Sequence, residues 1–118
     1  MKFLILGCNG MAGHTISLYL KERGHDVFGF DLRKSSLIDS AEGDAKNIAF
    51  LTDLISNGKY DSVINCIGIL NQQAEDNKAL ASFLNGYFPH FLADVTKNTD
   101  TQVIHMSTDC VFSGMKGQ

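Results

Sequence analysis

The sequence predicts an α/β fold with a parallel sheet, and two observations lead to this prediction. Short apolar runs alternate with longer segments of helical periodicity along the 118 residues, and strands separated by helices of ten or more residues are joined by parallel crossovers. Glycines stand where these segments end, at Gly7, Gly24 and Gly58. The hydrophobic fraction of 44% is that of an ordinary globular core. No repeat, low-complexity stretch or linker divides the chain, so residues 1–118 are expected to form one domain.

The first part of the chain contains two predicted strands and one predicted helix. Lys2–Leu6 is a short apolar run closed by glycine, which is typical of a strand buried on both faces. Met11–Arg23 has helical periodicity and is followed by a glycine, and Val27–Phe30 is a second apolar run. Leu37–Asn47 is predicted as a loop with room for a short extra strand. The apolar stripe of the helix recurs every four residues, at Ala12, Ile16 and Leu20.

The second part contains two predicted helices and two predicted strands. A helical stripe precedes Gly58, and Ser62–Ile67 is the third strand. The longest apolar stripe, Leu80–Val95, contains Pro89, which is expected to kink the helix or to loosen one of its turns. Gln102–Met106 is the fourth strand. The stripe before Gly58 consists of Ile48, Leu51, Leu54 and Ile55.

Charge and hydropathy limit the functions that the chain can have. The formal net charge of −3 gives no general attraction to nucleic acid or to anionic lipid, so neither is expected as a partner. No apolar run approaches the roughly 20 residues that cross a bilayer. The run Phe3–Leu6 is also too short for a signal peptide, whose apolar region needs about 7 residues or more. Three cysteines, an odd number, argue against a disulfide framework. We therefore expect a protein of the reducing cytoplasm.

Residues 7–13 predict a binding turn for a diphosphate. The string Gly-Cys-Asn-Gly-Met-Ala-Gly follows the first strand directly and opens the first helix. One glycine permits a tight turn, a second lets main-chain N–H groups approach an anion, and a third lets the helix pack closely on the sheet. The helix N-terminus adds about half a positive charge without a lysine. We predict a Rossmann-type, doubly wound sheet that binds a dinucleotide through Gly7, Asn9, Gly10, Met11 and Gly13.

Asp31 strengthens this interpretation, because it ends the second strand about 20 residues beyond the glycines. A carboxylate there accepts hydrogen bonds from the adenosine ribose and disfavours a 2′-phosphate, which favours NAD as the cofactor. Arg33, two residues on, could pair with that phosphate, so NADP remains open. Outside this context, Asp31 would be interpreted as a polar residue at a strand end.

Three cysteines and two histidines are the remaining candidates for chemistry. Cys8, Cys66 and Cys110 each follow a predicted strand, so they are expected to gather around the cofactor cleft. Since no C-x-x-C pair or suitably spaced histidine accompanies them, we predict no metal site. They are interpreted as small residues where the backbone and the ligand approach closely. His14 is expected to face solvent, and His105 to be a core histidine with a hydrogen-bond partner.

Two further strings complete a resemblance to a known family. Asn-Cys-Ile-Gly at 65–68 and Ser-Thr-Asp-Cys-Val-Phe at 107–112 follow the third and fourth strands. Together with the glycine turn and Asp31, they make the chain resemble the N-terminal part of an extended short-chain dehydrogenase/reductase. Within that superfamily it is most similar to the dTDP-4-dehydrorhamnose reductase branch. The resemblance covers essentially the whole chain, whereas such enzymes are considerably longer. It therefore implies a truncated NAD(P)-binding domain over 1–118 without its substrate lobe.

The resemblance implies a role for each matching position. Thr108 would hydrogen-bond the keto oxygen of the substrate and help to stabilise the charge that develops there. Asp44 matches an acidic position near the adenine, and Asn85 matches an asparagine of the long helix behind the site. Cys110 stands where a tyrosine is more frequent, which affects how the substrate is placed. The segment whose backbone lines the cofactor is matched by Cys66, Ile67 and Gly68.

One feature of the family has no counterpart in the sequence. The general acid of the family is a tyrosine with a lysine four residues later on the same helix face. Tyr19, Tyr60 and Tyr87 have other residues at that distance. The chain ends before the expected Tyr-x-x-x-Lys helix, so we expect a fragment that binds a dinucleotide and does not turn over substrate.

The resemblance implies an oxidoreductase of nucleotide-sugar metabolism and polysaccharide biosynthesis. Its reaction would be hydride transfer from NAD or NADP to a 4-keto sugar nucleotide. A sugar-nucleotide epimerase or dehydratase is an alternative, although its oxyanion segment usually reads Ser-Ser-x-x-Val-Tyr. A non-catalytic dinucleotide-binding regulatory module is another alternative, which the missing Tyr-x-x-x-Lys pair favours. The surface around His90 forms a dimer interface in many relatives, so a homodimer is also an expectation.

Overall fold

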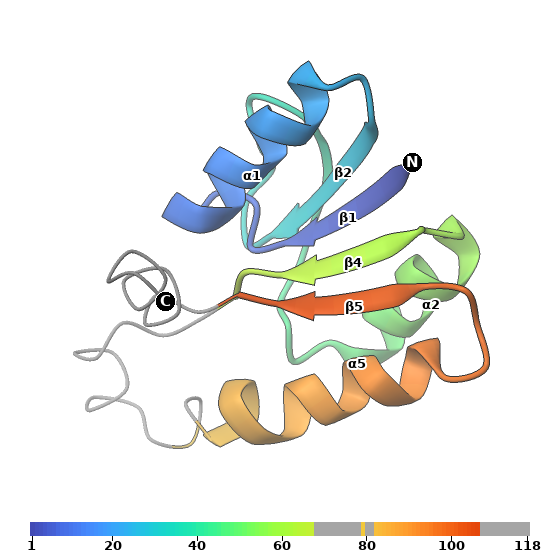
Figure 1. Ribbon diagram of the computed structural model, residues 1–118. Helices are drawn as coiled ribbons and strands as arrows, with labels where there is room; N and C mark the ends of the chain where they lie inside the picture. Colours follow the sequence, from blue (N-terminus) through green and yellow to red (C-terminus); the bar gives the residue numbers. More distant parts are fainter. Residues whose placement is uncertain (68–78, 80–81, 107–118) are drawn as a thin grey trace, which may run out of the picture.

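The computed structural model describes residues 1–67, 79 and 82–106. Over these residues the chain forms a five-stranded parallel sheet with helices on both faces (Figure 1), which confirms the predicted Rossmann-type α/β fold. The elements are, in chain order, β1 Lys2–Leu6, α1 Met11–Glu22, β2 Asp26–Asp31, β3 Asp39–Glu42, α2 Ile48–Gly58, β4 Ser62–Asn65, η1 Phe83–Tyr87, α5 Phe88–Thr96 and β5 Gln102–His105.

The order of the strands identifies where a ligand can bind. The sheet runs β3-β2-β1-β4-β5, so the first three strands step towards one edge and β4 returns to the other side of β1. In the register of the sheet, Leu6 lies between Phe30 of β2 and Asn65 of β4. Open α/β sheets bind ligands beyond the carboxyl ends of the strands at such a reversal. The turn after β1 and the segment after β4 therefore form the position of interest.

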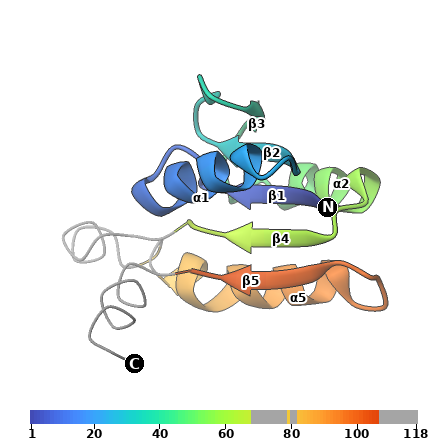
Figure 2. The same cartoon turned by 45° about the horizontal axis from the view of Figure 1, so that its top comes forward.

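The two faces of the sheet carry different helices. Alternate residues of β1 point to opposite faces, with Leu4 and Leu6 on the side of α2 and α5 and with Phe3 and Ile5 on the side of α1. Figures 1 and 2 show α1 on one side of the strands and α5 on the other. The α2 and α5 side contains the larger core cluster: Leu4, Leu6, Phe30, Leu51, Ile55, Tyr60, Val63, Leu84, Phe88, Phe91 and Leu92.

The contact between α1 and the sheet includes the predicted stripe at Ile16 and Leu20 and extends beyond it to Gly13 and Ser17. The buried residues of α1 are Gly13 and Ser17, whereas Ile16 and Leu20 are only partly buried in the cluster that α1 covers. The reason is that α1 lies so close to the β1 end that an added Cβ at Gly13 would overlap the Gly7 carbonyl oxygen. Only residues with little or no side chain fit along the line of closest approach.

Several of the predicted element boundaries hold and some move. The short extra strand predicted within Leu37–Asn47 is confirmed as β3. The third strand ends at Asn65 instead of Ile67. The loosened turn predicted at Pro89 is confirmed, because the turn before it is the π-helical η1, in which the Phe88 N–H donates to the Phe83 carbonyl oxygen. Proline has no N–H, so the regular α-helical ladder cannot continue through it.

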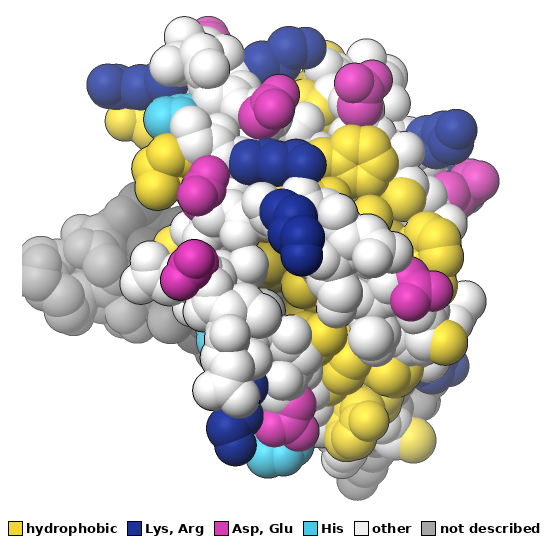
Figure 3. Space-filling model, turned by 90° about the vertical axis from the view of Figure 1, so that its right-hand side faces the viewer, with side chains coloured by type: hydrophobic (Ala, Val, Ile, Leu, Met, Phe, Trp, Pro, Cys, Tyr) yellow, Lys and Arg dark blue, Asp and Glu magenta, His cyan; other side chains and the backbone are white. Residues whose placement is uncertain are grey.

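The amino ends of the strands lie opposite to the predicted binding turn. Figure 3 shows this side, where Lys and Arg side chains alternate with Asp and Glu side chains over an apolar band. Lys2 belongs to this side through its Nζ, which donates to the Gly58 carbonyl oxygen and lies 5.1 Å from the centre of the Tyr60 ring. None of the helices in the described ranges is long and apolar enough to cross a membrane.

Candidate functional site

The turn after β1 is in direct contact with the segment after β4. Gly7 has a φ of 81°, a conformation that residues with a Cβ rarely adopt. A Cβ added there would lie 3.0 Å from the carbonyl carbon of Cys66 and 3.0 Å from the amide nitrogen of Ile67. Gly7 thus serves two purposes at once, since it permits the turn and lets the two main chains meet at the point where the strand order reverses.

The amide hydrogens of residues 7–10 are all engaged within the protein. Gly7 N–H and Cys8 N–H donate to the Phe30 carbonyl oxygen over 2.7 and 3.3 Å. Asn9 N–H donates to Asp31 Oδ2 over 2.9 Å, and Gly10 N–H donates to the Gly7 carbonyl oxygen over 3.1 Å. These four amides shape the turn. They leave the binding of an anion to the residues that follow.

The first turn of α1 provides the free donors. Within the part of the chain that the structure describes, the amides of Met11, Ala12 and Gly13 have no hydrogen-bond acceptor. Gly10, the N-cap residue, has no side chain to cap them, and the first turn has no acidic residue. An uncapped helix N-terminus with converging N–H groups suits a phosphate. Of the sequence-predicted turn residues, Met11 and Gly13 therefore have free donors, whereas Gly7, Asn9 and Gly10 contribute shape.

Asp31 lies beside this turn at the end of β2. Its Oδ2 accepts from Asn9 N–H, and its Oδ1 accepts from Leu32 N–H over 2.7 Å. A carboxylate has about four lone-pair positions, so two remain for the hydroxyls of a ligand. The carboxylate is therefore oriented by the protein and still able to accept hydrogen bonds, as the predicted ribose contact requires.

The other two polar candidates of this region are exposed. The Arg33 side chain faces solvent, while its carbonyl oxygen accepts from Asn9 Nδ2 over 2.8 Å. Asp44 follows Gly43, whose N–H donates to the Asp31 carbonyl oxygen over 2.9 Å. Asp44 Oδ1 accepts from Lys46 N–H over 2.9 Å, which orders the loop before α2. The fold thus brings the Asp44 loop to the end of β2.

Sequence reasoning missed a polar pair at the carboxyl ends of β4 and β5. Asn65 is 4% exposed; its Oδ1 accepts from Ile67 N–H over 3.1 Å and its Nδ2 lies 3.2 Å from His105 Nδ1. The two side chains are therefore within hydrogen-bond distance of each other. The prediction that His105 lies in the core is wrong, because its side chain is exposed; the predicted hydrogen-bond partner is present.

The thiols of Cys8 and Cys66 lie together on the α1 side of the sheet, as their positions after β1 and β4 predicted. Burial raises the pKa of the Cys8 thiol, and the Asp31 carboxylate raises it further. Burial, together with the neighbouring Cys8, raises the pKa of Cys66 to about 11. Both are therefore protonated and unreactive near neutral pH. Over the described residues, no group of three metal-ligating side chains occurs.

Some candidates fall outside the residues that the structure describes. Thr108, Gly68 and Cys110 belong to this group. The backbone of Asn85 lies in η1, but its side chain is outside the description as well. The roles assigned to these residues therefore stay predictions.

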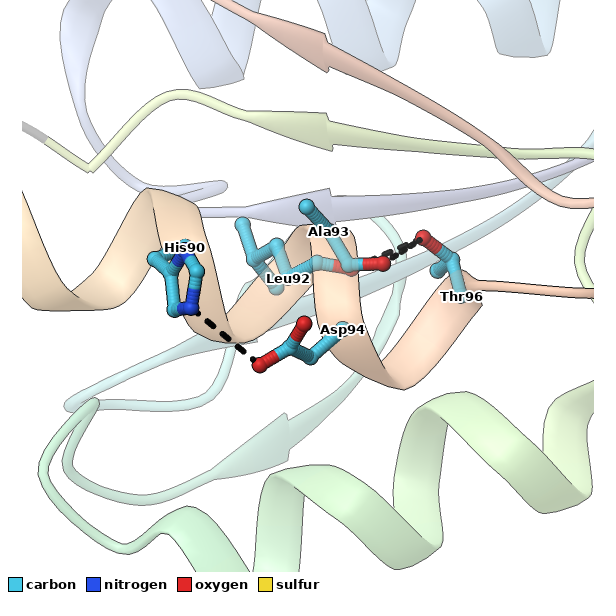
Figure 4. A network of polar contacts seen from close by, with 5 residues as sticks. All are labelled: His90, Leu92, Ala93, Asp94 and Thr96. Carbon is cyan, nitrogen blue, oxygen red and sulfur yellow. Dashed lines mark hydrogen bonds and ion pairs between the residues drawn. The ribbon is translucent and has the colours of Figure 1, made fainter.

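The outer surface of α5 has its own polar contacts. Figure 4 shows His90 Nε2 beside Asp94 Oδ2, which lie 3.4 Å apart on one side of the helix, and both side chains are largely exposed. Thr96 Oγ1 donates to the Leu92 carbonyl oxygen over 2.8 Å. Of these residues His90 and Asp94 are exposed, whereas Thr96 is buried. The pairing of the exposed surface with a second copy stays a prediction.

A hollow of about 400 Å³ lies elsewhere, at the C-terminal end of α1. It is lined by side chains of both charges, among them Lys21 and Asp39, and Lys21 Nζ donates to the Leu37 carbonyl oxygen over 2.8 Å. This hollow is separate from the N-terminal turn of α1, so it does not belong to the predicted site.

Comparison with known proteins identifies the family. The family model named RmlD substrate binding domain matches residues 1–118. The chain belongs to this family. A probable low-salt glycan biosynthesis reductase, Agl14, of Haloferax volcanii is 31% identical over 97% of this chain and 39% of its own length. A dTDP-4-dehydrorhamnose reductase of Mycolicibacterium smegmatis is 31% identical over 97% of this chain and 32% of its own length. The resemblance noted in the sequence is thereby confirmed, and the chain spans less than half the length of these relatives.

Solved structures confirm the fold of this RmlD-family chain. L-threonine 3-dehydrogenase from Trypanosoma brucei has a TM-score of 0.80 at 16% identity, over 88% of this chain and 35% of that one. WbmH from Bordetella bronchiseptica, whose crystal structure is in complex with NAD+, has a TM-score of 0.68 at 23% identity, over 81% of this chain and 34% of that one. At these identities the likeness concerns the arrangement of the strands and helices.

Proposed function

We propose that this RmlD-family chain is the dinucleotide-binding domain of an NAD(P)-dependent reductase that acts on a 4-keto sugar nucleotide. The observation that carries the proposal is the uncapped first turn of α1, which presents the Met11, Ala12 and Gly13 amides at the reversal of the strand order. The names of the sequence relatives, a dTDP-4-dehydrorhamnose reductase and a glycan biosynthesis reductase, support the substrate class.

The residues present fit a nicotinamide dinucleotide. The three α1 amides would hold its diphosphate, and the oriented Asp31 carboxylate would accept from its ribose hydroxyls. The main chain of Cys66 and Ile67, fixed by Asn65, would line its other side. A bound cofactor of this kind supplies the hydride.

The substrate end of the proposed reaction depends on residues beyond the described part. Thr108 would donate a hydrogen bond to the keto oxygen and stabilise the charge that develops on it. No tyrosine of the 118 residues has a lysine four residues later. In the proposed reaction, the general acid that donates the proton to the product hydroxyl is therefore a group outside these residues.

The proposed cofactor is NAD in preference to NADP. The negative charge of Asp31 would repel a 2′-phosphate, whereas it matches the hydroxyls of NAD. The exposed Arg33 side chain is the group that would allow NADP as a second cofactor.

Met11→Pro tests the amide site directly. Met11 is the first residue of α1 and its side chain is 90% exposed, a position where proline fits a helix. Gly10 before it has φ −73° and ψ 170°, which proline permits in its predecessor. The variant therefore loses one amide hydrogen and little else. We expect NADH, titrated calorimetrically, to bind about tenfold more weakly.

Met11→Ala is the matched control, since it removes the same side chain and keeps the amide hydrogen; it should bind NADH as the parent does. Asp31→Ala should also weaken NADH binding about tenfold, while Asp53→Ala, which removes an exposed carboxylate from α2, should not. If NADH and NADPH bind to neither the parent chain nor the controls, the proposal is refuted. Reduction of a 4-keto sugar nucleotide is then measured with the protein as its gene encodes it.

A regulatory dinucleotide-binding module is the second candidate. The observation that favours it is that the contacts at the first turn of α1 and at Asp31 account for cofactor binding alone. The two functions are distinguished by the reading frame after codon 118. A continuing frame that encodes such a pair supports the reductase, and a stop codon supports the binding module.

A further inference from the structure

Asn9 joins the turn after β1 to the loop after β2 by two hydrogen bonds. Its main-chain N–H donates to Asp31 Oδ2 over 2.9 Å, and its side-chain Nδ2 donates to the Arg33 carbonyl oxygen over 2.8 Å. The second bond spans 24 residues of sequence. Since the amide hydrogen of Asn9 is engaged by Asp31, Asn9 is not a donor to the diphosphate.

The segment that Asn9 holds carries two basic side chains. Leu32, Arg33 and Lys34 are all exposed. Before this segment, Leu32 N–H donates to Asp31 Oδ1, and after it, Ser35 N–H donates to Ser40 Oγ over 2.8 Å. Between these two anchors, the Asn9 side chain supplies a bond to the middle of the segment, at Arg33. Its removal would leave the basic residues held only from the two ends.

We infer that Asn9 is a positioning residue that sets the preference between NAD and NADP, an inference that rests on the proposed function. The two cofactors differ at the 2′ position of the ribose, where the Asp31 carboxylate repels a phosphate and the Arg33 guanidinium attracts it. The main chain of Asn9 orients Asp31, and its side chain fixes Arg33. Asn9 therefore restrains the main chain from which the Arg33 side chain extends, relative to the Asp31 carboxylate.

The two bonds of Asn9 make separable contributions. Replacing the side chain leaves the main-chain bond to Asp31 in place, and Asp31 also keeps its bond from Leu32 N–H. The carboxylate should therefore stay oriented for the hydroxyls of NAD. Only the Arg33 segment is released, so the loss is confined to the attraction for a 2′-phosphate.

The experiment compares NADH and NADPH in calorimetric titrations of the chain and its variants. For Asn9→Ala we expect the Kd of NADPH to rise about tenfold and the Kd of NADH to change by less than about twofold. Arg33→Ala should give the same selective loss. Because both changes act through one group, the double variant should be no weaker for NADPH than Arg33→Ala alone.

Thr101→Val is the matched control. The Thr101 hydroxyl also donates to a main-chain carbonyl oxygen, that of Tyr60, over 2.6 Å, but it lies before β5 at the other end of the sheet. The Thr101→Val variant should leave the ratio of the Kd of NADPH to the Kd of NADH unchanged. If Asn9→Ala does not fold, Asn9→Ser repeats the test. Serine is compatible with a turn, and its side chain is too short to reach the Arg33 carbonyl oxygen.

The outcomes separate the inference from the proposed function. If Asn9→Ala and Asn9→Ser weaken NADH and NADPH equally, or change neither, Asn9 does not set the preference and the inference is overturned. If the unmodified chain binds neither cofactor, the proposed function fails first and the inference fails with it. A selective loss of NADPH in both Asn9 variants, absent from Thr101→Val, supports the inference.

Discussion

On the face that α2 and α5 cover, the sheet buries large side chains such as Phe30 and Phe88, which are 1% and 0% exposed. On the opposite face, α1 approaches through Gly13 and Ser17. The first face is stabilised by the volume of apolar side chains removed from water. The second face also buries an apolar cluster around Phe3 and Ile5. At the end of β1, however, it depends on close contact between main chains, which a Cβ at Gly13 would prevent.

This difference explains why the candidate site forms beside α1. A helix that is separated from the sheet by aromatic rings would hold its N-terminus several ångströms above the strand ends. Because Gly13 has no Cβ, the first turn of α1 packs on the Gly7 carbonyl, and its free amides lie directly at the switch between β1 and β4. The close packing of α1 on the sheet thus has two consequences. It leaves less room for apolar side chains on this face, and it places the free amides of α1 at the candidate site.

The largest expected effect comes from filling the close contact. Gly13→Ala places a methyl group on the Gly7 carbonyl oxygen, so α1 must move away from the sheet. We expect a loss of about 4 kcal/mol or more in the free energy of unfolding, measured in urea. Gly10→Ala is the control, since its Cβ would lie 3.4 Å from the same oxygen, and it should cost at most about 1 kcal/mol. Equal losses would show that α1 is not held by close approach.

Removing volume from the other face should give the next largest effect. Phe88→Ala deletes a fully buried ring and is expected to cost about 3–4 kcal/mol in the same urea experiment. Phe50→Ala, at a position 37% exposed on α2, should cost less than half of that. If Ile16→Ala on α1 destabilises the chain as much as Phe88→Ala does, the two faces do not differ in the way described.

A smaller effect is expected from the hydroxyl on the contact line of α1. Ser17 Oγ donates to the Gly13 carbonyl oxygen over 2.6 Å and is buried, whereas Thr15 Oγ1 makes the equivalent bond to Met11 over 3.0 Å on the exposed side. Ser17→Ala should cost about 1 kcal/mol and Thr15→Ala close to nothing, as determined by thermal unfolding. A larger loss of stability for Thr15→Ala than for Ser17→Ala would show that α1 does not bury the side that carries Ser17.

A last effect, on reactivity and not on stability at neutral pH, concerns the thiols on the α1 face. The pKa of Cys66 is raised from 9.0 to about 11, so at pH 8 its thiolate is roughly a hundredfold scarcer than that of an ordinary thiol. Its alkylation by iodoacetamide, followed by peptide mass spectrometry, should be correspondingly slow. Bound NADH should slow it further. In the chain unfolded in urea, the alkylation rate of Cys66 should have its midpoint near pH 9. The same midpoint in the folded chain would contradict the burial of this thiol.

The same shift has a consequence for stability. Because the folded state favours the protonated thiol, its contribution to stability is complete below about pH 9. It is lost as the pH rises from 9.0 towards about 11. Cys66→Ala should therefore reduce the pH dependence of the unfolding midpoint within this window.

Much of the fold could be predicted from local patterns. The bounds of β1 at Lys2–Leu6 are those predicted, and β3 and the loosened turn before Pro89 lie where they were expected. Where prediction failed, the deciding factor was what lies next to a segment in space. No local pattern marked Ser17 as a buried residue of α1, although Ile16, Leu20 and Gly13 lie where the apolar stripe and the third glycine of the turn indicated. His105 was expected in the core, yet its side chain is exposed.

The sequence by itself determined the order of strands and helices and the location of the glycine turn, because these follow from apolar periodicity and backbone freedom within a few residues. Only the tertiary structure decided which amides remain free and which side chains orient them. The bonds from Asn9 to Asp31 and Arg33, and from Asn65 to His105, join residues 22, 24 and 40 positions apart. Such bonds form only when parallel strands align in register, a property that no local pattern contains.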